Sequence, residues 1–394
     1  MKIAIFSDNF LPIISGVNTS VVNAVKKLSS MGHSVMIFAA KPPEQIQEQF
    51  GKNVILNFMD NYKNVKLIQY KEFRVAKTDY SVLSKIKTFR PDVIHVHLPT
   101  PLGWTGVLYA KMNNIPLVTT YHGYFADFLG HSTLPKRITS SRIARSLAWS
   151  YQKKFHDLST IIISPSETTR KELLKMGFKA PIRVVTNGVN TSVFHALPGR
   201  SSKKILLHVG RLSYEKKVDV VIDAFKIVAK KNRDCILHIV GTGPQEQAYK
   251  ESAGSLLGKR IFFFGHVEHE KLAQYYSKGY VFATGSTIET EGLVLLEAMA
   301  CGCPVVGVDV RAIPEIVKNN LSGFIVKEGD SKSMALKILK LLENRPLRNK
   351  MSQKAVEIAG NYSLDMAAVK LENTYLEAIS IRLQKGKRIK MNNI

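Results

Sequence analysis

Short runs of β-branched and other apolar residues alternate with longer helical patterns along the whole chain. A helix is expected over Asn18–Met31, closed by Gly32. Strands that alternate with helices are typical of βαβ units on a parallel sheet. The strands expected in the first half are Lys2–Ser7, Ser34–Ala39, Val65–Tyr70, Val93–Val96, Leu117–Tyr121, Ile161–Ser164 and Arg183–Val185.

The pattern starts again at Lys204, after a Pro- and Gly-containing segment, Asn190–Lys204, that predicts a linker. Helices are expected at the end of the chain, over 332–343 and 364–383, with no strand between them. A chain of 394 residues exceeds one ordinary core. We therefore predict an α/β protein with domains at 1–190 and 204–360, and a C-terminal helix of about 364–394 that packs back on the first domain. The strands expected in the second half are Lys204–Val209, Ile236–Val240, Ile261–Phe264, Val281–Ala283, Val305–Val308 and Phe324–Val326.

Composition narrows the class of protein. With 45% hydrophobic and 22% charged residues, the chain is globular rather than disordered. Among its three cysteines, Cys301 and Cys303 have a spacing that fits neither a disulfide framework nor a zinc site, which favours a reducing compartment. No apolar run approaches the roughly 20 residues that span a bilayer. The net charge of +25, partly from a basic tail after Arg382, is explained by an acidic partner, an anionic surface or a lysine-rich composition.

Two segments that follow expected strands carry candidate chemistry. In the segment from Gly285 to Val306, Glu289 and Glu297 are eight residues apart, and Gly292 precedes a helix. The free backbone N–H groups of such a helix hold anions, and carboxylates accept bonds from vicinal hydroxyls. In the second segment, which begins at Gly210, Arg211 supplies a fork of donors and Lys216 a point charge, which suits a diphosphate leaving group.

The first of these segments resembles the E-x7-E motif of the retaining glycosyltransferases of family 4, and the resemblance runs over essentially the whole chain. It implies the GT-B fold, with two doubly wound Rossmann-like domains facing a cleft. It also implies that Glu289 contacts the donor hexose, that Glu297 holds the nucleotide ribose, and that the amides near Leu293 and Val294 face the donor phosphates. Glu291 stands where many members carry Phe or Gln, which leaves its role open.

Other loops resemble further parts of that family. The segment containing Arg211 and Lys216 is similar to its G-R-L-x-x-E-K motif. The Ser15-Gly16 pair is similar to its glycine loop, and Gly16 lets the backbone approach the donor closely. The resemblance implies that His122 contacts the transferred sugar, and that the loops with Gly243 and His266 line the nucleotide pocket.

Some residues resemble metal-binding or dinucleotide-binding sites, but the surrounding sequence does not support either kind of site. His95 and His97 alternate on one strand like metal ligands, but the surrounding apolar residues favour a buried parallel strand. The glycine-rich loop at Gly241 lacks the dinucleotide fingerprint. The resemblance implies that no metal is strictly required, and the lack of an Asp-x-Asp metal motif agrees with this. We therefore expect no cofactor.

One segment, Lys136–Phe155, bears on the acceptor side of the protein. It is predicted to form a helix in which apolar residues stand between basic ones. Such a helix can lie on an anionic bilayer, or it can use its apolar residues to pack on its own sheet. The opening segment from Phe10 to Val21 resembles the acceptor loop of diacylglycerol glucosyltransferases. The candidate membrane residues are Lys136, Arg137, Arg142, Arg145, Trp149 and Lys153.

The predicted function is transfer of a hexose from a nucleotide sugar to a membrane lipid such as diacylglycerol. The predicted hexose is glucose, and the predicted donor is UDP-glucose. The resemblance implies retention, with front-face attack and the departing diphosphate taking the proton. The expected location is cytoplasmic, on the inner face of the cell membrane. The alternatives are a transferase for a polysaccharide or polyprenyl-linked glycan, a nucleotide-sugar epimerase, and a non-enzymatic nucleic-acid-binding protein. No recognised nucleic-acid motif supports the last alternative, so no nucleic acid is expected as a partner.

Overall fold

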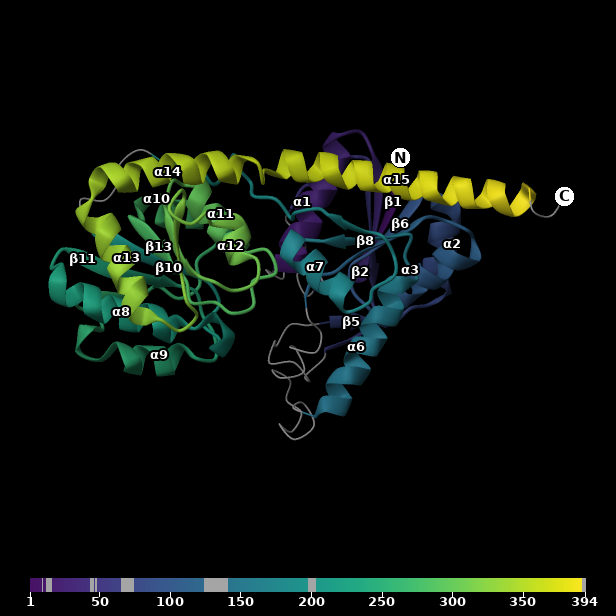
Figure 1. Cartoon of the computed structure of the whole chain (residues 1–394). Helices are drawn as coiled ribbons and strands as arrows, with labels where there is room; N and C mark the ends of the chain where they lie inside the picture. The colour runs from purple at the N-terminus through teal and green to yellow at the C-terminus, as the bar shows by residue number, and fades with distance from the viewer. Residues whose placement is uncertain are drawn as a thin grey trace. The chain divides into compact units, whose positions relative to one another are not determined.

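The structure is a computed structural model that describes residues 1–8, 10–11, 16–42, 46, 48–64, 74–123, 141–197 and 203–391. The chain divides into two compact units, each with its own parallel sheet (Figure 1). The first unit is Met1–Asn187 together with the chain from Ala367 onward, and the second is Gly188–Met366.

The described residues of the first unit form a seven-stranded sheet in the order β3-β2-β1-β6-β7-β8-β9. All neighbouring strands are parallel. The strands of this sheet are β1 Lys2–Phe6, β2 Ser34–Ala40, β3 Val54–Met59, β6 Val93–Val96, β7 Leu117–Thr120, β8 Ile161–Ser164 and β9 Ile182–Val184. A separate antiparallel pair consists of β4 Tyr62–Asn64 and β5 Arg74–Ala76.

Helices cover this sheet, and several begin at a side-chain cap. The side chains of Asp79, Thr100 and Ser166 accept bonds from backbone N–H groups of the first helical turn. The last helix packs on the core of the first unit through the buried residues Leu371, Tyr375 and Ala378. Figure 1 shows this helix lying along the first unit. The helices are α1 Gly16–Ser30, α2 Tyr80–Phe89, α3 Pro101–Met112, α6 Arg142–Asp157, α7 Glu167–Lys175 and α15 Leu364–Met391.

Asp8 lies just beyond β1 and ties three elements of the first unit together. Its carboxylate accepts a bond from the Ala76 backbone N–H at 2.8 Å and another from the Thr100 hydroxyl. Burial raises the pKa of Asp8 to about 7, although both hydrogen bonds act in the opposite direction. The charge state of one buried carboxyl is therefore coupled to the folding of this unit.

The described residues of the second unit form a six-stranded parallel sheet in the order β12-β11-β10-β13-β14-β15. Its strands are β10 Lys204–Val209, β11 Cys235–Val240, β12 Ile261–Phe263, β13 Val281–Ala283, β14 Val305–Val308 and β15 Gly323–Val326. The α-helices are α8 Val218–Lys231, α9 Glu246–Ala253, α10 His269–Lys278, α11 Leu293–Ala300, α12 Ile313–Ile316, α13 Ser331–Glu343 and α14 Arg345–Gly360. Two 3-10 turns are η1 Tyr214–Lys216 and η2 Gly254–Leu256.

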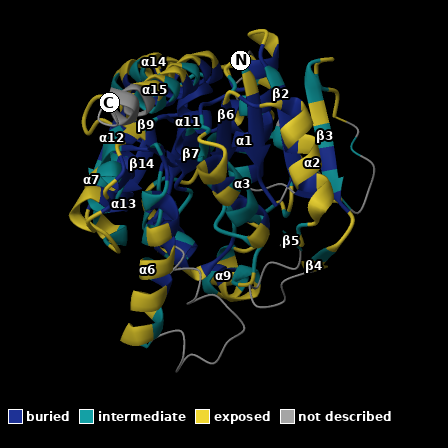
Figure 2. Ribbon diagram, turned by 90° about the vertical axis from the view of Figure 1, so that its right-hand side faces the viewer, coloured by how far each residue is buried: buried dark blue, intermediate teal, exposed yellow. Residues whose placement is uncertain are grey.

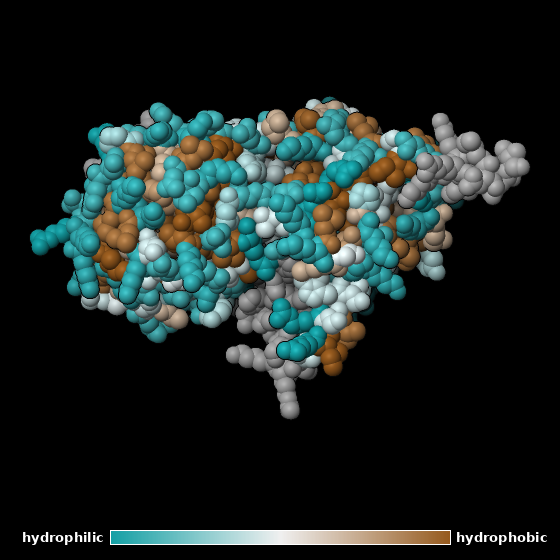
Figure 3. Space-filling view, viewed as in Figure 1, coloured by the Kyte–Doolittle hydropathy of each residue, from teal (hydrophilic) through white to brown (hydrophobic). Residues whose placement is uncertain are grey.

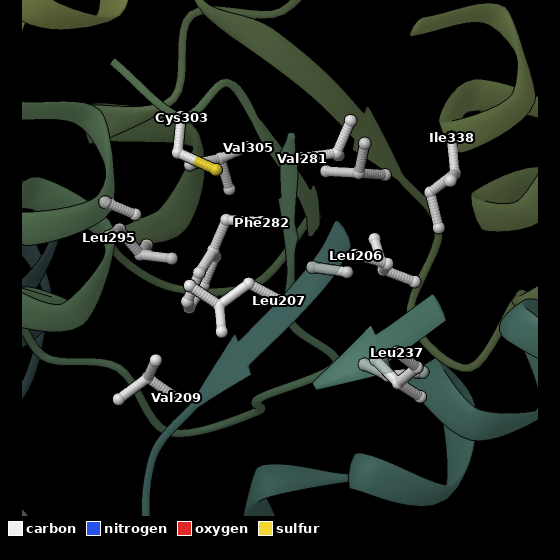
Figure 4. Packing of buried hydrophobic residues seen from close by; sticks show 14 of the residues in the cluster. Leu206, Leu207, Val209, Leu237, Val281, Phe282, Leu295, Cys303, Val305 and Ile338 are labelled. Carbon is white, nitrogen blue, oxygen red and sulfur yellow. The ribbon is translucent and has the colours of Figure 1, made fainter. Parts of the chain in front are cut away.

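The core of the second unit lies between this sheet and its helices. Figure 4 shows Leu206 and Leu207 of β10 near Phe282 of β13, with Leu295 of α11 on one side and Ile338 of α13 on the other. These strands are buried on both faces, as expected where helices cover both sides of a parallel sheet. The strand ends are thereby held in place for the loops that follow them.

The predicted fold class is confirmed, and most strands lie within one residue of their expected bounds. The expected strand Val65–Tyr70 falls outside the described residues. Strands β3, β4 and β5 and helix α14 were not predicted. The expected linker differs in part, because residues 188–197 belong to the second unit. Phe194 is buried in its core, and the Val189 N–H donates to the Tyr362 carbonyl at 2.7 Å.

Candidate active site

The loop between β13 and α11 presents open backbone amides at a helix start. Gly292 has a positive φ of 89° immediately before α11. The N–H groups of Leu295 and Leu296 donate to the Gly292 carbonyl at 2.9 and 3.3 Å. Leu293 and Val294 are half-buried, and their N–H groups have no partner among the described residues. These are the two amides predicted to face an anion, and their geometry suits one.

Two of the predicted catalytic residues are in direct contact. The Lys216 Nζ, from η1 after β10, donates to Glu289 Oε1 at 2.6 Å. Burial raises the pKa of the Glu289 carboxyl, but the Lys216 ammonium and its hydrogen bond help to bring it below its usual value. Glu289 is therefore held ionised. Arg211 lies in the same loop, half-buried, five positions before Lys216.

Glu297 is held by two residues of α10 that were not predicted. His269 Nε2 lies 3.0 Å from Glu297 Oε1, and the Tyr276 hydroxyl donates to Oε2 at 2.8 Å. The two residues are seven apart and so share one face of the helix. That spacing is the signal that was available in the sequence. His266, the predicted histidine, lies exposed in the loop after β12.

The glycines after β10 and β11 allow two loops to touch backbone to backbone. The Leu212 N–H donates to the Thr242 carbonyl, and the Gln245 N–H donates to the Leu212 carbonyl, both at 2.9 Å. A Cβ on Gly243 would lie 2.3 Å from the Leu212 carbonyl oxygen. Gly243 is thus required for the position of the loop that carries Arg211.

In the first unit, His122 follows β7 and is joined to a neighbouring histidine. His97 Nδ1 lies 2.7 Å from His122 Nε2. Burial lowers the pKa of His122 to about 4, so its ring is neutral at neutral pH. His95 and His97 are buried at the end of β6, as expected, but the contact with His122 was missed. Gly16 begins α1, and a Cβ there would meet nothing within 4 Å among the described residues.

Helix α6 both packs inward and exposes apolar residues. Phe155 is fully buried and Trp149 packs against a small core cluster, as the packing alternative predicts. Ile143 and Leu147 are 73% and 66% exposed, as the membrane alternative requires. Figure 2 shows the start of α6 extending away from the sheet, and Figure 3 shows hydrophobic surface there.

The basic residues of this segment also differ in their surroundings: some are exposed and one is paired within the protein. Arg142 and Arg145 are exposed at the start of α6, whereas Lys153 forms an ion pair with Asp157. Lys136 and Arg137 lie outside the described residues. The exposed surface made by Arg142, Ile143, Arg145 and Leu147 is called the α6 tip below.

A metal-binding cluster and a membrane-spanning helix are both absent from the described residues. No group of three or more His, Cys, Asp or Glu side chains in the described ranges is arranged to hold a metal ion. Within the same part of the chain, no helix combines the length and apolar character needed to cross a bilayer.

The groups around Glu289 can therefore hold an anion and a polyhydroxylated ligand together. Cationic Lys216 and open amides suit a diphosphate, and the two glutamates suit hydroxyl groups. Two models of glycosyltransferase families match different parts of the chain. Residues 192–357 match the family model "Glycosyl transferases group 1", and residues 14–193 match "Glycosyltransferase Family 4".

Full-length relatives are similar over nearly the whole chain. The alpha-monoglucosyldiacylglycerol synthase of Streptococcus pneumoniae is 27% identical over 96% of this chain and 86% of its own length. The sulfoquinovosyl transferase SQD2 of Arabidopsis thaliana is 27% identical over 93% of this chain and 71% of its own. Among solved structures, sucrose-phosphate synthase from Thermosynechococcus elongatus is 18% identical, with a TM-score of 0.77 over 96% of this chain and 99% of its own.

Proposed function

Since the chain belongs to the glycosyltransferases of family 4 and group 1, with the GT-B fold, we propose that it moves a hexose from a nucleotide sugar to a membrane lipid. The donor we propose is UDP-glucose, and the acceptor a diacylglycerol-type lipid. The observation that carries the proposal is the set of groups around the start of α11: open amides, the Lys216–Glu289 ion pair, and Glu297.

We assign the donor's parts to these groups by charge and hydrogen-bonding capacity. The diphosphate is placed against the amides of Leu293 and Val294 and the cations Arg211 and Lys216. As the glycosidic bond breaks, charge grows on this diphosphate, and cations already in place stabilise it without reorganisation. Glu289 accepts bonds from hexose hydroxyls while it keeps its contact with Lys216.

Glu297 is assigned to the ribose. Its two oxygens already accept from His269 and Tyr276, at 3.0 and 2.8 Å. Each carboxylate oxygen offers more than one lone pair, so both can still accept a ribose hydroxyl. Because His269 and Tyr276 fix the Glu297 carboxylate, the two ribose hydroxyls would bind an acceptor that is already correctly oriented.

We propose that transfer retains the anomeric configuration. The acceptor hydroxyl attacks the anomeric carbon on the face from which the diphosphate leaves. The new C–O bond forms as the old one breaks, and the hydroxyl proton passes to the departing diphosphate. The step is balanced without a covalent enzyme intermediate.

The α6 tip supports a lipid acceptor. Ile143 and Leu147 expose apolar surface next to the exposed cations Arg142 and Arg145. Apolar side chains that enter a bilayer beside cations that meet anionic headgroups are the features of an interfacial helix. The relatives named alpha-monoglucosyldiacylglycerol synthase support the same class of acceptor.

The test is product analysis with UDP-glucose, UDP-galactose or GDP-mannose, with and without anionic vesicles that contain diacylglycerol. We expect an α-linked glycolipid from UDP-glucose only when vesicles are present. Equal transfer to soluble sugars without vesicles would overturn the lipid assignment. Turnover of short oligosaccharides alone would favour polysaccharide or polyprenyl-linked glycan assembly instead.

Substitutions at the α6 tip test the membrane contact separately from chemistry. The double variant Ile143→Asp and Leu147→Asp is expected to lower glycolipid formation at least tenfold and to leave UDP binding unchanged. Leu336→Asp is the matched control, because Leu336 is 58% exposed on α13 of the other unit. Equal losses in both variants would show that apolar exposure at the α6 tip has no special role.

A further inference from the structure

His97 and His122 stand side by side at the ends of neighbouring strands. β6 and β7 are parallel, with Val96 opposite Thr119, so the residues after these strands meet at one sheet edge. The two ring planes are inclined by 23°, and the ring centroids are 5.0 Å apart. The 2.7 Å distance between His97 Nδ1 and His122 Nε2 is that of a hydrogen bond.

The other nitrogen of His97 decides which ring donates. His97 is only 4% exposed, and its Nε2 has no hydrogen-bond partner among the described residues. If His122 donated, His97 would carry its hydrogen on Nε2 as a buried, unpaired N–H. If His97 donates, Nε2 is a buried lone pair. An unpaired acceptor is better tolerated in proteins than an unpaired N–H, so His97 donates.

Both rings are neutral, as this argument requires. Burial lowers the pKa of His122 to about 4 and that of His97 well below its usual value. A neutral imidazole carries a single hydrogen. Since His122 Nε2 accepts from His97, the one hydrogen of His122 is on Nδ1.

We propose that His97 is a positioning residue that fixes His122 as the Nδ1–H tautomer, so that His122 meets the substrate as a hydrogen-bond donor and not as a base. The contact of His122 with the transferred sugar is what the family resemblance implies, and it rests on the function proposed above. A fixed Nδ1–H can donate to a hydroxyl or to an oxygen that gains charge as the hexose departs. His97 itself need not touch the substrate.

The tautomer can be measured without turnover. Nitrogen-15 NMR of protein labelled at histidine, with His122 assigned by comparison with His122→Gln, is expected to show a pyrrole-type Nδ1 and a pyridine-type Nε2. In His97→Leu, which cannot donate, this preference is expected to disappear. A wild-type His122 with its hydrogen on Nε2 would overturn the inference, and this holds even if the protein transfers no hexose to any tested acceptor.

Kinetics then test whether the tautomer matters. His97→Leu is expected to lower kcat about tenfold to a hundredfold, the effect of one substrate hydrogen bond, with KM for the nucleotide sugar within threefold. His97→Asn places an amide N–H near the former Nδ1 and is expected to recover most of kcat. Equal loss in both variants would overturn the donor argument.

Two further variants separate positioning from stability. His156 is another buried histidine of this unit, and its Nδ1 bonds Thr119 rather than His122. His156→Leu is expected to lower the melting temperature but to keep kcat within threefold. In a His122→Ala background, adding His97→Leu is expected to change kcat no further, and a further tenfold loss would contradict the assigned role.

Discussion

Replacing Lys216 with methionine tests the ion pair at the centre of the proposed site. The variant keeps the length of the side chain and removes the ammonium that lies 2.6 Å from Glu289. The two side chains are 21% and 12% exposed, so Glu289 would be left as a mostly buried, unpaired charge. Breaking a fully buried pair costs about 3–5 kcal/mol. Because this pair keeps some contact with solvent, we expect a loss of about 2 kcal/mol in the unfolding free energy at pH 7.

The pH dependence of this loss has a definite sign. In the wild type the pKa of Glu289 is below its usual value, so the pair stabilises the fold above the usual carboxyl pKa and loses this contribution as pH falls through the lowered pKa. Without Lys216, burial raises the pKa of Glu289. As pH falls, the carboxyl takes up a proton, and the variant regains the stability that the buried, unpaired charge had cost it. The gap between wild type and variant is therefore widest near pH 7 and closes as pH falls toward about 4.

The assay must report on the second unit. Both tryptophans, Trp104 and Trp149, belong to the first unit, so their fluorescence serves as an internal control. Hydrogen exchange of the β10 and β13 peptides measures the opening free energy of the unit that carries the pair. Catalysis is measured in parallel, and a loss of about 3 kcal/mol in transition-state stabilisation, roughly a hundredfold in kcat, is expected.

A double variant supplies the decisive comparison. In Lys216→Met with Glu289→Gln no buried charge remains, so stability is expected to recover at pH 7 while activity stays low. If the stability gap of Lys216→Met were unchanged between pH 7 and pH 4, Glu289 would not be the group that responds. The same conclusion would follow if the double variant were less stable than Lys216→Met.

Three further predictions concern groups around the two sites. In the wild type, the stability of the first unit is expected to fall as pH rises from about 4 to about 7, because burial raises the pKa of Asp8 from 3.8 to about 7 and the fold favours the protonated carboxyl. Asp8→Asn is expected to remove this fall, which is measured by tryptophan fluorescence in urea. Tyr276→Phe removes one bond to Glu297 and is expected to weaken UDP binding about fivefold by calorimetry. Gly243→Ala is expected to lower the melting temperature by several degrees, whereas Gly360→Ala, where a Cβ has open space, changes it little.

Each of these has an outcome that would contradict it. An unchanged pH slope in Asp8→Asn would assign the titration to another group. UDP binding that is unaffected by Tyr276→Phe would mean that Glu297 does not need this donor to hold the ribose. Equal melting temperatures for the two glycine variants would mean that the loop at Leu212 shifts without cost.

The regular elements were predictable because their hydrophobic runs are local and periodic. Strands such as β8 and β10 are buried on both faces, so they appear in the sequence as continuous apolar runs. β3 was missed although Val54–Met59 is apolar at every position except Asn57, so its pattern was as clear as that of β8 or β10. In α14 the signal is weak, because the exposed face of this helix is rich in polar residues.

Within the candidate site, the residues that came from a recognisable motif were located more easily than the residues that support them. Lys216 and Glu289 lie 73 positions apart, and their contact depends on β10 and β13 being neighbours. His97 and His122 likewise meet only because β6 pairs with β7. Contacts of this kind depend on strand order, which hydrophobic periodicity does not specify.

The supporting contacts bear on how a donor would bind. Before any ligand arrives, Glu289 is paired with Lys216, and Glu297 is held by His269 and Tyr276. Both carboxylates are thus fixed during folding, and their orientation adds no further entropy cost when the donor binds. The incoming diphosphate meets a Lys216 ammonium already shared with a carboxylate, so its attraction to that cation is smaller than that of a bare lysine. Donor specificity should then come mainly from the ribose and hexose hydroxyls, which Glu297 and Glu289 can accept only in a fixed geometry.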